Sequence, residues 1–155
     1  MKTFRIGILI SAVILSGCAN TLDGSIRIAN KNFDQEFSAY RYIQTEEETT
    51  HISYELKAAG EPAETIASNS PDLLKDLFKG FQSTCSFSKE ELIETRVVYH
   101  KAPLFYEVWV FNDELSERAD KTSALSVILT ADSTGTDINI KGNCHGADQR
   151  IVLGK

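Results

Sequence analysis

The side chains best suited to chemistry in this chain are two of its three cysteines and two of its three histidines. Cys85, Cys144, His100 and His145 carry the thiol and imidazole groups that bind zinc in proteins. A thiol beside an imidazole is also the pairing of a nucleophile with its base. The spacing favours neither chemistry, because no Cys-x-x-Cys or His-x-x-x-His pair fixes two such groups locally. The sequence therefore predicts no metal ion and no other cofactor.

A serine and a glutamate are the remaining candidates for a reaction centre. Ser86 and Lys89 match the Ser-x-x-Lys pattern of penicillin-binding enzymes, and residues 121–123 are close to their Lys-Thr-Gly element. The third element, Ser-Asp-Asn, is missing, and one Ser-x-x-Lys match is expected by chance. Glu107 is the single charge in an otherwise apolar segment, which favours an edge or snorkelling position over a catalytic acid.

The first 17 residues have the pattern of a signal peptide. Lys2 and Arg5 give a positive start, residues 6–15 are apolar, and Ser16 and Gly17 are small residues before a cleavage point. The apolar run of about ten residues is too short to cross a bilayer, which needs roughly 20. The pattern predicts that this segment is removed and that the rest of the chain is exported.

Leu15, Ser16, Gly17 and Cys18 resemble the lipobox of bacterial lipoproteins. The resemblance implies that the Cys18 thiol is joined to diacylglycerol, that cleavage falls before Cys18, and that an acyl chain such as palmitate is added to its amino group. Two or three acyl chains anchor a protein stably, whereas one does not. An Asp after the Cys favours the inner membrane in Gram-negative lipoproteins, and this chain has Ala19 there. The resemblance thus implies an outer-membrane anchor that faces the periplasm.

Once Cys18 is joined to lipid, Cys85 and Cys144 remain as an even pair. They would lie in an oxidising compartment, where disulfides persist. Alternation of polar and apolar residues places Cys144 on the same face as Ile138 and Ile140, which predicts that it points into the core. Cys85 follows an amphipathic helix that should pack on that core. We therefore predict a disulfide between Cys85 and Cys144.

The charge of the mature chain limits its partners. Removal of Lys2 and Arg5 leaves 14 of the 16 basic residues against 22 acidic ones, a net charge near −8. Nucleic acid is an unsuitable partner, because its binding depends on neutralising phosphates with Lys and Arg. The same sign opposes binding to anionic lipid, so the acyl chains must supply the membrane affinity.

Two helices are indicated by capping signals. Ser70 and Pro71 begin a helix whose apolar stripe runs to Phe81. Ser88 and Glu91 form a capping box, which predicts a second, short helix that ends near residue 94.

Strands are indicated by alternating and β-branched segments. They are predicted at 37–44 and 50–58 as a hairpin, at 95–100, at 104–112, and at 123–131 and 136–142 as another hairpin, with an edge strand at 151–153. The segment 104–112 is apolar on both faces, so we expect it at the centre of the sheet. Asp132, Thr134 and Asp137 could bind calcium, but a hairpin turn around Gly135 explains them better.

Together these signals predict a tether over residues 18–31 and a single α+β domain over residues 32–155. The expected fold has two layers, with an antiparallel sheet of about five to seven strands and one main helix and a short second helix on one face. A domain of this length suits one hydrophobic core.

Aromatic residues are dense in the predicted strands. If several project from the face of the sheet away from the helix, they form an interaction patch; the candidates are Tyr40, Tyr42, Tyr54, Tyr106 and Trp109. The favoured function is accordingly a lipid-anchored envelope protein with a non-catalytic domain that binds an envelope protein partner. The alternatives are a module that binds a small ligand or lipid between sheet and helix, and a hydrolase.

Overall fold

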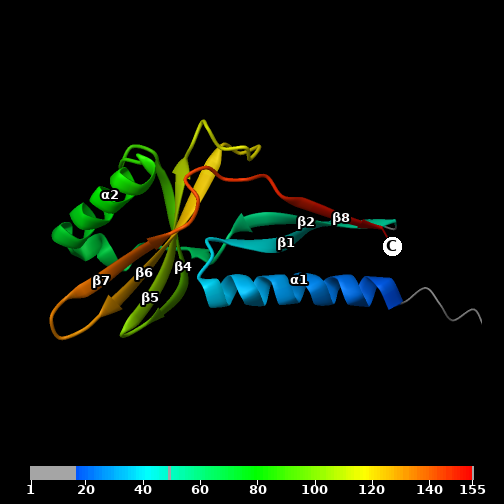
Figure 1. The fold of residues 1–155 in the computed structure, drawn as a ribbon, viewed down its shortest axis with the longest axis horizontal. Coiled ribbons are helices and arrows are strands. Elements are labelled where there is room, and N and C mark those ends of the chain that lie inside the picture. Colours follow the sequence, from blue (N-terminus) through cyan, green and yellow to red (C-terminus); the bar gives the residue numbers. More distant parts are fainter. Residues whose placement is uncertain (1–16, 49, 155) are drawn as a thin grey trace, which may run out of the picture.

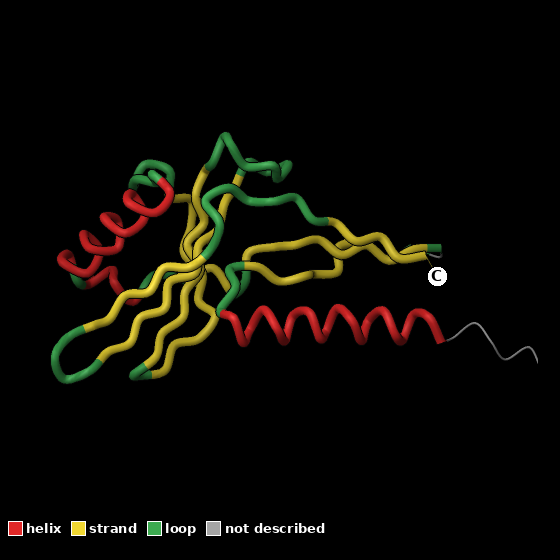
Figure 2. The backbone as a smooth tube through the Cα atoms, viewed as in Figure 1, coloured by secondary structure: helices red, strands yellow, loops and turns green. Residues whose placement is uncertain are grey.

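Two antiparallel sheets and two α-helices make up the part of the chain that the computed structural model describes, residues 17–48 and 50–154 (Figure 1). Residues 1–16, which contain most of the predicted signal peptide and two residues of the lipobox-like motif, Leu15 and Ser16, lie outside the described residues. Five strands form the main sheet, in the order β3-β4-β5-β6-β7. Three strands, β1-β2-β8, form a second sheet that projects from it as an arm (Figure 2). The predicted α+β class, with an antiparallel sheet and one main helix, is confirmed.

The main sheet has strand β5 at its centre, as predicted. Its strands are β3 (Glu61–Pro62), β4 (Leu92–Lys101), β5 (Leu104–Asn112), β6 (Thr122–Ala131) and β7 (Thr136–Lys141). The β6–β7 hairpin is confirmed, and Asp132 holds its turn by accepting hydrogen bonds from the backbone N–H groups of Thr134 and Gly135. Strand β5 pairs with β4 and β6 along its length and is covered on both faces. Polar and apolar residues therefore do not need to alternate along β5.

Helix α2 (Pro71–Cys85) covers one face of the main sheet. It begins as predicted, with Ser70 as the N-cap. Phe81 is fully buried, and its ring packs on those of Trp109 and Phe111 in β5. Burial of a side chain of this size contributes about 1.5–3 kcal/mol to stability.

A second apolar core covers the opposite face of the main sheet. Its buried members are Ala39, Ala59, Tyr106, Val108, Val110, Ala124 and Ile128. Two tyrosine hydroxyls fasten the base of the arm to this face: that of Tyr106 donates to the carbonyl of Ser38, and that of Tyr40 accepts from the N–H of Ala124. The base of the arm thus covers β5 from the side that α2 leaves open.

The arm consists of β1 (Tyr40–Glu47), β2 (His51–Ala58) and β8 (Arg150–Gly154). The predicted hairpin and C-terminal edge strand are confirmed, but they form their own sheet and do not extend the main one. The chain turns from the arm into β3 at Gly60, which has a φ of +80°. A Cβ at Gly60 would lie 2.5 Å from the carbonyl oxygen of Val97, so only glycine permits this close approach.

Helix α1 (Gly17–Glu36) replaces the tether predicted for residues 18–31. Its docked side includes buried Ile26, and the Asn30 amide, which accepts from the N–H of Tyr42 at 2.8 Å and donates to its carbonyl at 2.9 Å. Phe33 packs on the Tyr42 ring. Because Asn30 satisfies both backbone groups of Tyr42, α1 acts at this point as a neighbouring strand would for the edge strand β1.

The short second helix predicted near residues 88–94 is absent. The chain forms a turn there and enters β4 at Leu92. The capping pair itself is present, because the Ser88 N–H and hydroxyl both donate to the Glu91 carboxylate, at 2.6 and 2.7 Å. The helix does not continue because the Glu91 carbonyl accepts from the N–H of Asn112, so pairing with β5 has already begun.

We predict that Asn30→Ala loosens α1 from the arm. The Tyr42 N–H and carbonyl would lose their partner, at a cost of about 1–3 kcal/mol. Urea unfolding should show that loss, and the Tyr42 amide should exchange its hydrogen at least about tenfold faster. Lys31→Ala, at the exposed neighbouring position, is the control. Equal exchange rates in the two variants would contradict this role of Asn30.

Candidate functional site

The end of α1 that carries Cys18 lies far from the main sheet. Cys18 is the second residue of α1, and a helix rises 1.5 Å per residue, so about 27 Å of helix separates Cys18 from Glu36. The arm runs beside α1, and the tip of the arm lies near the start of the helix (Figure 1). Cys18 is therefore at one end of an elongated body, and the main sheet and α2 are at the other.

The disulfide between Cys85 and Cys144 is present, as predicted. The Cα atoms are 4.9 Å apart, and the two cysteines lie 59 positions apart in the sequence. Both cysteines are half-buried: Cys85 ends α2 and packs against the core, whereas Cys144 lies beyond the end of β7 and does not point into the core as predicted. Closing a loop of this length stabilises the fold by at most about 4 kcal/mol in the chain-entropy model. The bond also fixes residues 142–146 to α2.

The five aromatic residues predicted to form an interaction patch do not share one exposed surface. Trp109 is buried under α2, and Tyr106 is buried on the opposite face of the main sheet. Tyr54 is buried in the arm, while Tyr40 and Tyr42 are half-buried. The Tyr42 hydroxyl donates to Gln149. Most of their apolar surface is buried in the two cores or in the contact with α1.

Glu107 is fully buried at the centre of the main sheet, contrary to the edge or snorkelling position predicted for it. Its Oε1 accepts from the N–H of Ile66 at 2.8 Å and from Nε2 of His100 at 2.9 Å. Its Oε2 accepts from the Thr65 hydroxyl at 2.6 Å and from the Trp109 indole N–H at 3.0 Å. A carboxylate has about four lone-pair sites, so these four donors saturate Glu107. It anchors the loop before α2 to the sheet.

Two sets of residues are of the types found in hydrolase sites, but neither set has the geometry of such a site. Ser86 is the C-cap of α2, at the far end of that helix from the loop that Glu107 holds. Elsewhere, Asp113 Oδ2 accepts from the Ser123 hydroxyl at 2.6 Å and lies 3.1 Å from His145 Nδ1. The serine thus donates to the carboxylate, whereas nucleophilic attack requires a hydrogen bond to the imidazole.

These hydrogen bonds also set the protonation of Asp113. Burial by itself would raise the pKa of Asp113, but the hydrogen bonds from Ser123 and His145 outweigh burial, and the pKa lies below its usual range. Asp113 is therefore an ionised acceptor near neutral pH. Gly146 donates its N–H to Ser123 at 2.6 Å, so the cluster fastens the segment after β7 to the main sheet.

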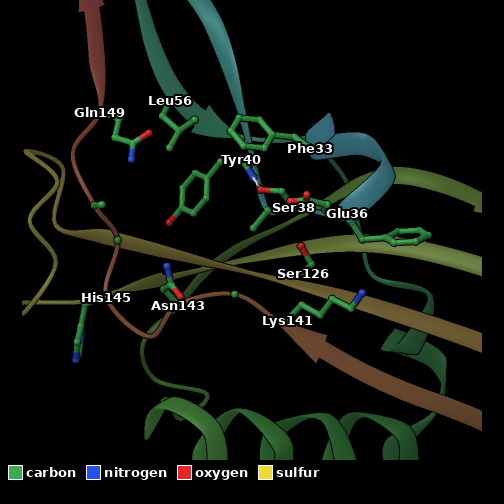
Figure 3. Close-up of a pocket in the computed structure, with 15 residues that line it drawn as sticks. Phe33, Glu36, Ser38, Tyr40, Leu56, Ser126, Lys141, Asn143, His145 and Gln149 are labelled. Atoms are coloured by element: carbon green, nitrogen blue, oxygen red, sulfur yellow. Dashed lines mark hydrogen bonds between the residues drawn. The ribbon is translucent and has the colours of Figure 1, made fainter. Parts of the chain in front are cut away.

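A cleft of about 300 Å³ opens where α1, the arm and the main sheet meet (Figure 3), and we call it the junction cleft. It is lined by Phe33, Glu36, Phe37, Ser38, Ala39, Tyr40, Leu56, Ser126, residues 141–143, residues 145–147 and Gln149. The alternative considered from the sequence placed a cavity between the sheet and its main helix. The apolar core under α2 fills that space, and the cleft lies on the opposite face.

A larger hollow of about 650 Å³, the inter-sheet groove, separates β1 and β2 of the arm from the main sheet. Ile43 and Ile93, which are 48% and 54% exposed, both line it. Arg96 and Arg118 also line it, and each is ion-paired, with Glu94 and Asp120 respectively. The groove therefore combines two open apolar side chains with two arginines that already have ion-pair partners.

No protein-family model matches the chain, and no curated protein or solved structure is significantly similar to it. Within residues 17–48 and 50–154, no helix is both long and apolar enough to cross a membrane. In the same residues, no group of three His, Cys, Asp or Glu side chains is placed to hold a metal ion.

We predict that Glu107→Gln destabilises the fold. A Gln side chain brings an NH₂ group against the donors that now saturate the carboxylate, so one or two buried donors lose their acceptor, at about 1–3 kcal/mol each. The midpoint of urea unfolding should fall accordingly. Glu114→Gln, at an exposed position, should leave it unchanged. Equal stability of the two variants would show that the buried carboxylate does not hold the loop.

Proposed function

We propose that this chain is a lipid-anchored envelope protein whose domain binds another envelope protein and does not catalyse a reaction. The lipobox at residues 15–18 supports lipid attachment at Cys18. Ala19 in place of Asp supports an outer-membrane anchor that faces the periplasm. The observation that carries the proposal is that α1 begins at Gly17 and is docked on the arm through Asn30, so the anchored residue belongs to the folded body.

A helical connection holds the domain differently from a flexible tether. With α1 upright on the bilayer, its length lifts the main sheet about 27 Å above the anchored residue. Contacts of Asn30 and Phe33 with Tyr42 hold the domain in a fixed orientation relative to α1, whereas a flexible tether would leave it free to turn. The tip of the arm then lies nearest the membrane, and the main sheet is presented to partners farther out.

The inter-sheet groove is the surface that best suits a protein partner. Ile43 and Ile93 offer exposed apolar area inside a hollow, where a partner side chain can be covered from two sides. Ala58, Ala59, Gly60 and Ala124 along the groove are small and allow a polypeptide backbone to approach closely. An extended segment of an envelope protein with apolar side chains fits this shape and leaves the paired charges at the rim.

The saturated Glu107 and the Ser123–Asp113 hydrogen bond support a non-catalytic role. Both carboxylates are occupied by fixed donors from their own chain, which suits anchoring of loops. Scattered basic residues against an acidic excess support a protein partner over nucleic acid.

Lipid attachment is tested by Cys18→Ser. Cells fed an alkyne analogue of palmitate should label the wild-type chain and move it into the detergent phase on Triton X-114 partition, and Cys18→Ser should abolish both. The double variant with Cys85→Ser and Cys144→Ser is the matched control, and it should keep its label. Labelling of Cys18→Ser at the wild-type level would refute anchoring at this residue.

The groove is tested by a photo-crosslinking amino acid placed at residue 43 or 93 in living cells. Both positions should yield an adduct with the same envelope protein, because both side chains line one hollow. Position 152, which is 57% exposed on β8 and outside the groove, is the control. Adducts at residues 43 and 93 no different from those at 152 would count against a partner in the groove.

A further inference from the structure

We infer that the junction cleft binds a small zwitterion, an amino acid or the end of a short peptide, with its apolar side chain against the aromatic wall of the cleft. Its volume of about 300 Å³ is at the lower end of the range for small-molecule sites. Of the residues that line it, the cleft shares only Tyr40 with the inter-sheet groove. Its ligand would therefore need neither the groove partner nor the lipid anchor.

One wall of the cleft is apolar and preformed. Phe33 from α1, Tyr40 from β1 and Leu56 from β2 lie together at this wall (Figure 3). Phe33 and Tyr40 are half-buried, so part of each ring remains open to the cleft. Tyr40 is held in place through its hydroxyl, which accepts from the N–H of Ala124 at 2.8 Å. A ligand with an apolar side chain would remove this ring surface from water.

The floor of the cleft contains a buried hydroxyl. Ser126 on β6 is fully buried, and its side chain lies within hydrogen-bonding reach of the Tyr106 hydroxyl. Figure 3 shows the hydroxyl directed from β6 toward Ser38. The neighbouring Tyr106 hydroxyl already donates to the Ser38 carbonyl. Because Ser126 is closed off from solvent, a ligand in the cleft meets the side chains around it instead.

Two opposite charges line the cleft without being paired. Lys141 Nζ lies 5.4 Å from the centroid of the Phe37 ring, and no carboxylate of the described residues forms an ion pair with it. Glu36, at the end of α1, also lacks an ion pair there. His145, which also lines the cleft, is engaged with Asp113 at 3.1 Å.

These charges select a zwitterion over a simple ion. A ligand carboxylate near Lys141 can also accept from the Asn143 amide, while its ammonium group balances Glu36. An anion that lacks the ammonium group would be repelled by Glu36, and a cation that lacks the carboxylate would be repelled by Lys141. The disulfide at Cys144 fixes the wall that carries Asn143, so the polar groups are held in place before the ligand arrives.

Three probes of one shape test this inference: L-phenylalanine, 3-phenylpropionate without the ammonium group, and phenylethylamine without the carboxylate. Each is titrated into the full-length, ¹⁵N-labelled chain in detergent micelles, up to about 20 mM, a range that detects millimolar binding. L-Phenylalanine should shift the amides of Gly142, Gly146 and Ala147 in a saturable way. It should bind about tenfold more tightly than either analogue, which corresponds to about 1.4 kcal/mol.

Variants at the two charges separate the contributions. Lys141→Gln should weaken L-phenylalanine about tenfold and leave phenylethylamine unweakened, whereas Glu36→Gln should weaken L-phenylalanine and leave 3-phenylpropionate unweakened. Lys75→Gln and Glu114→Gln, at exposed positions outside the cleft, should change nothing. The inference is overturned if no cleft amide shifts, if an analogue binds as tightly as L-phenylalanine, or if the cleft variants behave as the controls do.

Discussion

Strand β5 is buried on both faces, and the rest of the architecture follows from that requirement. A strand with Val108 and Val110 on one face and Trp109 and Phe111 on the other cannot leave either face in water. Helix α2 covers one face. The second cover is supplied by the base of the arm, so the arm has to leave the main sheet at this point. The junction cleft lies beside that contact, where three elements meet and do not close completely.

Elements with strong local signals could be predicted from the sequence. The N-cap at Ser70, the apolar stripe of α2, the two hairpins and the central strand are all determined by neighbouring residues. Helix α1 could not be predicted in the same way, because its docked stripe joins one isoleucine to a polar residue, Asn30, whose partner is a backbone group of another strand. The helix predicted after Ser88 has its capping pair, but strand pairing with β5 prevails over local propensity.

The candidate sites were harder to predict than the fold, because their residues come together only in space. Glu36 and Lys141 are more than a hundred positions apart, and no spacing rule links them. The sequence around Tyr106 and Trp109 does not distinguish a buried ring from an exposed one. In the structure both rings are buried in the two cores. The cysteine pair was predictable on the assumption that Cys18 carries lipid, because one pair of cysteines then remains.

The two sheets also differ in how much of the chain must be in place before each can form. The disulfide loop from Cys85 to Cys144 contains all four long strands of the main sheet, which pair with their sequence neighbours. The arm, in contrast, joins β2 to β8, and its register sets Ile52 opposite Leu153 across nearly the whole domain. Because closing so long a loop costs entropy that only a formed main sheet offsets, we expect the arm to complete last. Pairing of β8 with β2 would therefore signal a fully folded chain.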